Sequence, residues 1–157
     1  MPRYRNLSLD ELESLEKEFI EFLVLNGITG EDWKKIKNQD LQKASKIIEA
    51  FSDVVFEKIM RKTEYLVLYE RHNIATFQCL SNKVVMVGIE CPINPEIDFR
   101  IHDVFAFMSS NPNAKMKVFT KDKVYTEVRE IEIYKMIKRG ASISDGVLFK
   151  KFCLLLQ

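Results

Sequence analysis

The first sixty residues place apolar side chains at the spacing of α-helices. Such positions recur through residues 9–25 and again through residues 41–61. Ser8 opens a capping box, which is a typical signal for the start of a helix. Thr29 gives a similar signal for a shorter helix, which ends before Asp40. The pattern therefore predicts an N-terminal group of three helices.

The hydrophobic period changes from about 3.6 to about 2 after this helical region. Residues 64–71, 74–80 and 83–90 alternate as strands do, and two-residue breaks separate them. Breaks of this length join neighbouring antiparallel strands, so the pattern predicts a three-strand meander. Residues 115–119 alternate lysine with apolar side chains and predict a fourth strand outside the meander.

The last third of the chain returns to helical spacing. Residues 126–139 form one predicted helix, and residues 145–156 form another with Ser144 as its N-cap. Residues 98–110 also favour a helix, without a defined start. Because no linker separates these elements, we expect one domain over residues 1–157. The predicted fold class is α+β, with N-terminal helices, a small antiparallel sheet and C-terminal helices.

The composition is that of a globular protein that can bury a core. The chain of 157 residues is 46% hydrophobic and 30% charged. It has no apolar run near the roughly 20 residues that a membrane helix needs, and no signal-peptide segment follows the charged N-terminus. Its three cysteines are isolated. These features predict a cytoplasmic protein without a disulfide framework.

Charge is distributed unevenly, although the net charge is only +1. Residues 1–60 hold 9 Lys and Arg against 12 Asp and Glu, a net charge of −3. Residues 111–157 hold 10 against 5, a net charge of +5. An acidic front and a basic back can attract each other within one fold or between two copies, and the basic back can also meet an acidic partner.

Three residues are candidates for a site at one corner of the predicted sheet. His72 follows the first strand and Cys91 follows the third, so the meander returns Cys91 to the His72 end. His102 lies a little further along the chain and can join them. A cysteine with histidines can hold a metal or act as a nucleophile with its base. The alternative is a turn histidine, a loop cysteine and a surface histidine that never meet.

Two residues of the helical region are candidates for binding. Asp53 belongs to an acidic ridge with Glu49 and Glu57. Such a ridge can bind a cation or a basic partner, but it is more typical of a solvated helix face. Trp33 is a candidate anchor for a partner protein. Its apolar neighbour at the start of the helix favours ordinary core packing instead.

The basic residues within 115–139, Arg129 among them, form a candidate nucleic-acid surface. Phosphate contacts need clustered cations, and base stacking needs exposed rings. Three glutamates dilute this charge, and we expect Phe119 and Tyr125 to be buried. The sequence therefore argues against nucleic acid as the main partner.

The order of several short motifs resembles a bacterial family that is catalogued only as a domain of unknown function. The motifs include YRNLS at 4–8, DW at 32–33, FSDVV at 51–55 and GAxISxG at 140–146. The resemblance covers nearly the whole chain and is weakest over 92–114. No activity, ligand or catalytic residue is known for that family. The resemblance therefore implies only a small protein of one domain.

The sequence contains no catalytic constellation and no phosphate-binding loop. We therefore predict no cofactor, no membrane association and a non-enzymatic binding or protein-interaction module. Its partner is another protein or a second copy in a homodimer. Two alternatives stay open. One is an enzyme or metal-binding protein with its site at the His72/Cys91 end of the sheet, and the other is nucleic-acid binding through residues 115–139.

Overall fold

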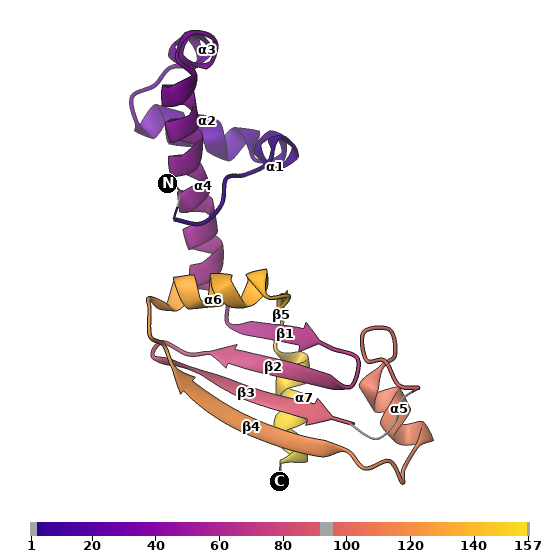
Figure 1. The fold of residues 1–157 in the computed structure, drawn as a ribbon. Helices are drawn as coiled ribbons and strands as arrows, with labels where there is room; N and C mark the ends of the chain where they lie inside the picture. The colour runs from indigo at the N-terminus through magenta and orange to yellow at the C-terminus, as the bar shows by residue number, and fades with distance from the viewer. Residues whose placement is uncertain (1–2, 92–95, 157) are drawn as a thin grey trace. The chain divides into compact units, whose positions relative to one another are not determined.

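The computed structural model describes residues 3–91 and 96–156 (Figure 1). By its internal contacts the chain divides into two units, Met1–Arg61 and Lys62–Gln157. The predicted α+β fold is confirmed, because helices precede and follow an antiparallel sheet. The single domain stays a prediction. None of the helices in the described ranges is long and apolar enough to cross a bilayer.

The first unit is helical, as the apolar periodicity predicts. Ser8 and Thr29 each accept a hydrogen bond from the backbone N–H three residues on. The side chains of Glu11 and Asp32 accept one in return, so two capping boxes start two helices. Asp40 starts the last helix by accepting a 3.1 Å hydrogen bond from an N–H of its first turn. The helices are α1 Leu9–Ser14, α2 Glu16–Leu25, α3 Gly30–Gln39 and α4 Leu41–Lys62.

The single helix predicted over residues 9–25 is wrong, because the chain breaks the helix at Leu15. The hydroxyl of Ser14 donates a 2.8 Å hydrogen bond to the carbonyl of Glu11. The N–H of Leu15 donates to the same carbonyl at 3.1 Å. The Leu15 N–H also donates to the carbonyl of Leu12 at 3.2 Å, a bond of the tighter 3₁₀ type that is common at helix ends. The break makes α2 a separate helix.

Aromatic side chains form the core of the first unit. Phe51 of α4 is 2% exposed. The Phe19 and Phe22 rings of α2 lie 5.0 and 5.4 Å from the Phe51 ring, centroid to centroid. The Trp33 ring of α3 packs edge-on against the Phe19 ring, with the ring centroids 5.1 Å apart. Edge-on and tilted arrangements are favourable for aromatic pairs, so one cluster joins three helices.

The second unit contains an antiparallel sheet. Its strands are β1 Tyr65–Tyr69, β2 Asn73–Cys79, β3 Lys83–Glu90, β4 Lys117–Val124 and β5 Ser142–Ser144. They lie in the order β4-β3-β2-β1-β5. The predicted meander is confirmed as β1 to β3. The predicted fourth strand is confirmed as β4, which starts later and runs further than its alternation indicates.

Residues 142–144 form a strand where the sequence predicts a helix N-cap. They pair antiparallel with β1, and Ile143 lies opposite Leu66. Three residues are too few to show a period of about 2. The last helix begins instead after Gly146, whose φ of +88° lies in the left-handed region that favours glycine.

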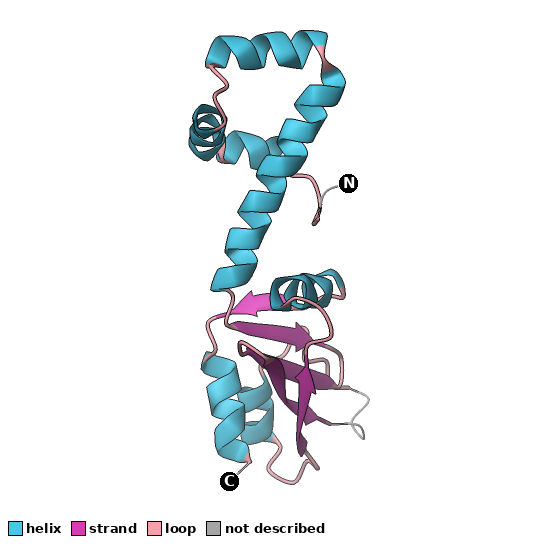
Figure 2. Ribbon diagram, turned by 90° about the vertical axis from the view of Figure 1, so that its left-hand side faces the viewer, coloured by secondary structure: helices cyan, strands magenta, loops and turns pink. Residues whose placement is uncertain are grey.

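The helices of the second unit cover the two sides of the sheet unequally. They are α5 Val104–Ser110, α6 Arg129–Lys138 and α7 Val147–Leu155. Figure 2 shows the sheet nearly edge-on, with α5 and α7 on one side and α6 on the other. Strand side chains alternate between the sides. We call the side that carries Val67 and Ile74 the α7 face, and the side that carries Phe77 and Met86 the α6 face.

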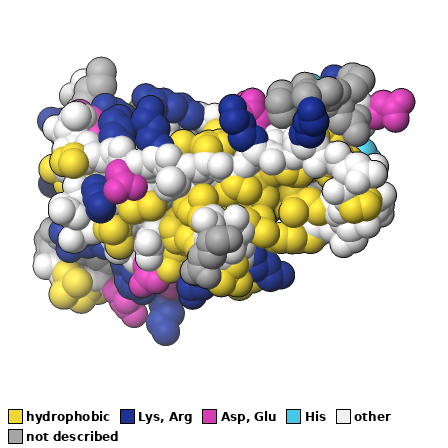
Figure 3. Space-filling view, turned by 90° about the horizontal axis from the view of Figure 1, so that it is seen from below, with side chains coloured by type: hydrophobic (Ala, Val, Ile, Leu, Met, Phe, Trp, Pro, Cys, Tyr) yellow, Lys and Arg dark blue, Asp and Glu magenta, His cyan; other side chains and the backbone are white. Residues whose placement is uncertain are grey.

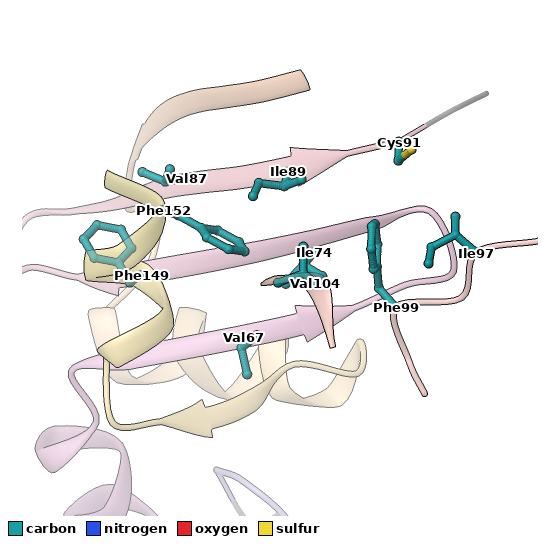
Figure 4. Close-up of a cluster of buried hydrophobic side chains, with 10 residues drawn as sticks. All are labelled: Val67, Ile74, Val87, Ile89, Cys91, Ile97, Phe99, Val104, Phe149 and Phe152. Carbon is teal, nitrogen blue, oxygen red and sulfur yellow. The ribbon is translucent and has the colours of Figure 1, made fainter. Parts of the chain in front are cut away.

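The main core of the second unit lies on the α7 face (Figure 4). Phe149 and Phe152 reach from α7 toward the strands, and Phe152 is 0% exposed. Phe105 of α5 packs against Phe152 with ring centroids 6.0 Å apart. The buried members of this cluster are Val67, Ile74, Val87, Ile89, Cys91, Ile97, Phe99, Val104, Phe149 and Phe152.

Apolar side chains of the second unit are not confined to this core. At the end of α7, Leu154 is 67% exposed and Leu156 is 44% exposed. Figure 3 views the molecule from below and shows a band of hydrophobic side chains between Lys and Arg side chains.

Candidate functional site

The register of the sheet places a row of side chains across the α6 face. Phe77 of β2 pairs with Met86 of β3, and Met86 pairs with Lys121 of β4. Directly paired residues point to the same face. Leu66 of β1, which pairs with Phe77, is 0% exposed, whereas Phe77 and Met86 are only half-buried. The row is therefore covered at β1 and open toward β4.

A groove of about 320 Å³ lies on this open part of the α6 face. Helical spacing puts Glu132, Met136 and Arg139 on one side of α6 and its C-cap, where they form one wall. Lys121 and Lys123 of β4 form the other wall. We call this the α6–β4 groove. The rest of its lining is Leu68, Phe77, Val84, Met86, Tyr125 and Ala141.

The rim of the α6–β4 groove carries more positive than negative charge. Lys121, Lys123 and Arg139 are exposed, and among the described residues none of them forms a salt bridge. Glu132 is the carboxylate of the lining, and it accepts a 2.8 Å hydrogen bond from the hydroxyl of Thr126. That bond is the main reason why the pKa of Glu132 is lowered. The carboxylate thus stays ionised and is engaged by the loop before α6.

Two titratable groups beside the groove hold one protonation state near neutral pH. Burial raises the pKa of Tyr125 to about 12, and its hydroxyl donates a 2.9 Å hydrogen bond to the carbonyl of Leu80. Burial also raises the pKa of the Cys79 thiol to about 11. A general acid or base works best with a pKa near the working pH. Neither group is tuned for that role.

Arg129 fastens the start of α6 to the sheet. Its side chain is 16% exposed. The guanidinium donates to the carbonyls of Cys79 and Leu80, both at 3.1 Å, and to the carbonyl of Thr63. A planar group with five donors suits such a set of acceptors. The structure therefore places this candidate binding residue against the backbone of its own unit.

The predicted corner site brings its residues together only in part. The N–H of Cys91 donates a 2.8 Å hydrogen bond to the carbonyl of His72, so the third strand does return to the His72 end. The side chain of Cys91, however, is 2% exposed and belongs to the apolar cluster of the α7 face. His102 is exposed and lines a cavity of about 410 Å³ with Asp103 and Phe107.

Two further observations describe the chemistry of this corner. Nε2 of His72 is buried, and it has no hydrogen-bond partner in the part of the chain that the structure describes. In the same part of the chain, no group of three His, Cys, Asp or Glu side chains could hold a metal ion. The structure therefore does not join His72, Cys91 and His102 into one cluster of ligands.

A family model described as "Family of unknown function (DUF6495)" matches residues 1–157. The chain belongs to this family. The resemblance to a domain of unknown function is therefore confirmed. No curated protein and no solved structure matches the chain.

Asp53 holds the N-terminal segment of the first unit against α4. Its carboxylate accepts hydrogen bonds from the backbone N–H groups of Arg3 at 3.0 Å and Tyr4 at 3.1 Å. One turn further on, Glu57 accepts a hydrogen bond from the Tyr4 hydroxyl and forms a 3.4 Å salt bridge with Arg3. The ridge that contains these two carboxylates is therefore not a freely solvated face, because it anchors the chain ahead of α1.

Trp33 belongs to the aromatic cluster of the first unit. It is half-buried, and its edge-on contact with Phe19 links α3 to α2. The structure thus places this candidate anchor within the packing of three helices.

Sequence reasoning missed the α6–β4 groove. The alternation of β3 predicts that Met86 faces away from Val87, but it does not predict which face a helix leaves open. The strongest available signal is the continued alternation through Lys121 and Lys123. Extending the fourth strand over these residues would have put two lysines on one face of an apolar sheet.

Proposed function

We propose that this protein is a non-enzymatic protein-interaction module and that its α6–β4 groove binds an amphipathic helix with acidic flanks. The observation that supports it most is the half-buried apolar floor of Phe77 and Met86 beneath three exposed cations. Pockets that combine an apolar lining with a few polar groups are the usual places for ligands to bind.

The position of the groove supports a helix as the occupant. α6 covers the β1 side of this face, and the side toward β4 is open. A sheet face is most stably covered by a layer of helices. An added helix beside α6 would complete that layer and bury Phe77 and Met86, which is how helix-in-groove complexes form.

Charge supports an acidic partner. Lys121, Lys123 and Arg139 line the groove, and the carboxylate of Glu132 is engaged by its own loop. Complementary charge raises association rates and selects among partners more than it raises affinity. The cations are therefore expected to decide which amphipathic helix binds, while the apolar floor supplies most of the affinity.

The titratable groups beside the groove support a binding role over acid–base catalysis. Tyr125 and Cys79 both have a pKa far above neutrality, and the pKa of Glu132 is lowered. Each group keeps one protonation state in the range in which most enzymes work.

We also propose a cytoplasmic location. Cys79, Cys91 and Cys153 are all free thiols, which supports a reducing compartment. Fractionation of cells that contain the untagged protein tests this location, and recovery from an oxidising compartment would contradict it.

The test of the binding function uses two synthetic peptides of about 18 residues, long enough to form helices on their own. Both carry one stripe of leucine on an alanine background, flanked by glutamate in one peptide and by lysine in the other. We expect the glutamate peptide to bind the full chain in a fluorescence anisotropy titration. The affinity should fall as salt rises, because the rim cations are exposed.

Two pairs of variants locate the binding. Lys121→Gln with Arg139→Gln is expected to weaken binding about fivefold, as two exposed charge pairs would. Lys115→Gln with Lys117→Gln removes the same charge outside the groove lining and should change little. Equal binding of both peptides, or equal loss in both pairs of variants, would contradict the proposal.

A further inference from the structure

We infer that α2 of a second copy of this chain occupies the α6–β4 groove. This inference rests on the proposed function, because it names which acidic helix binds there. Two copies that each insert α2 into the groove of the other form a closed dimer with two identical interfaces.

The outer side of α2 has the apolar stripe that the groove requires. Phe19, Phe22 and Leu23 turn inward, and Leu23 is 4% exposed. Ile20 and Val24 lie one helical turn apart, and they are 52% and 66% exposed. Both sides of α2 are therefore apolar, and only one of them is used within the first unit.

The charges that border this stripe are complementary to the groove. Glu16 and Glu21 are exposed on either side of the stripe, Lys17 lies beside it, and Glu18 is exposed on the far side of the helix. In the described ranges none of these three glutamates forms a salt bridge. Lys121, Lys123 and Arg139 of the groove likewise form no salt bridge within the described ranges. Acidic and basic groups that lack partners within one chain can find them in a second copy.

The sizes of the two surfaces also agree. α2 has 10 residues, which corresponds to a helix about 15 Å long. A helix of this length reaches along a wall such as that formed by Glu132, Met136 and Arg139, which spans two turns of α6. Ile20 and Val24 would then lie over Phe77 and Met86. Glu16 and Glu21, on opposite sides of the stripe, would face the two walls of the groove, each of which carries a cation.

The first experiment measures the mass of the full chain in solution by light scattering, over a range of protein concentrations and at two salt concentrations. We expect a dimer that dissociates on dilution and dissociates more readily at high salt. A monomer at every concentration and at both salt concentrations would overturn the inference.

The second experiment uses two complementary variants. Ile20→Glu breaks the stripe of α2 and leaves the groove intact. Met86→Glu puts a carboxylate beside Lys121 in the groove and leaves α2 intact. Each variant alone should be monomeric, because every reciprocal interface needs one intact stripe and one intact groove. An equimolar mixture should form a heterodimer through one intact interface, with weaker association than the unmodified chain.

Matched controls place the same new charge elsewhere. Leu9→Glu changes an exposed apolar residue of α1 that is 79% exposed, and Val124→Glu changes one of β4 that is 67% exposed. Both controls should dimerise as the unmodified chain does. Dimerisation by Ile20→Glu or Met86→Glu alone, or no association in their mixture, would overturn the inference. Circular dichroism melts verify that each variant is folded.

The peptide titration separates this inference from the proposed function. The Ile20→Glu variant keeps an empty groove, so the glutamate peptide should bind it at least as tightly as it binds the unmodified chain. If the peptide binds but the unmodified chain is monomeric, only the second copy as occupant is wrong. If the peptide does not bind this variant, the proposed function fails as well.

Discussion

The two faces of one sheet differ in how completely helices cover them. On the α7 face, Val87 and Ile89 are 1% and 0% exposed beneath α7. On the α6 face, Met86 directly precedes Val87 in sequence and is half-buried at the floor of a groove. The strands alternate apolar side chains to both faces. The difference therefore arises from the helices, since α6 covers only the β1 side.

This difference separates stability from recognition within the second unit. The side chains of the α7 face are already buried in a closely packed cluster, so removing them leaves cavities. The side chains of the groove are partly solvated, and their burial is completed only when a partner arrives. Substitutions on the two faces should consequently affect different measurements.

The largest expected effect follows from truncating the α7 face. Phe152→Ala removes a ring that is 0% exposed and should lower the free energy of unfolding by about 4 kcal/mol. Urea denaturation followed by circular dichroism measures this loss. A loss below about 1 kcal/mol would mean that the α7 face is not the main source of stability.

Arg129→Met tests how α6 is held on its face. The change leaves three backbone carbonyls without the guanidinium, and we expect a loss of about 3 kcal/mol in the same denaturation experiment. The neighbouring Glu130→Gln, whose carboxylate lies 3.8 Å from Arg129, serves as the control and should cost under about 1 kcal/mol. Similar losses for both variants would contradict the role of Arg129 as a clamp.

Met86→Ala tests the α6 face, where we expect a substitution to affect binding more than stability. Because Met86 is half-buried at an open groove, we expect a loss in stability of less than about 1.5 kcal/mol, well below that of Phe152→Ala. The affinity for the glutamate peptide should nevertheless fall severalfold. A large loss in stability with unchanged peptide binding would reverse the assignment of the two faces.

The smallest effect concerns pH. Hydrogen bonding to the Thr126 hydroxyl lowers the pKa of Glu132 below its ordinary value of 4.5. Its contribution to stability is therefore present above pH 4.5 and is lost as the pH falls through the lowered pKa of the folded state. The unmodified chain should lose more stability than Glu132→Gln on acidification below that range. Parallel pH profiles of the two proteins in thermal melts would contradict this role.

Helix starts and the central strands could be predicted from the sequence because their signals are local. The capping boxes at Ser8 and Thr29 and the alternation of β3 depend only on neighbouring residues. The break at Leu15 and strand β5 were missed. The first is a single residue between two helices that share one apolar stripe, and the second is three residues whose structure depends on pairing with β1.

The candidate residues show the same limit. Asp53 and Arg129 could be singled out by residue type, but their partners are backbone groups of distant segments: Arg3 and Tyr4 for Asp53, and Thr63 for Arg129. The groove could not be predicted because it depends on the part of a sheet face that α6 leaves open. No local pattern carries that information.

Methionine methyl NMR tests the binding role of the groove most directly. Met86 and Met136 both line the groove, whereas Met108 and Met116 pack against the cluster of the α7 face. On addition of the glutamate peptide to the methyl-labelled Ile20→Glu variant, the account predicts shifts of the Met86 and Met136 signals and unchanged Met108 and Met116 signals. Shifts confined to Met108 and Met116, or no shift at all under saturating peptide, would contradict it.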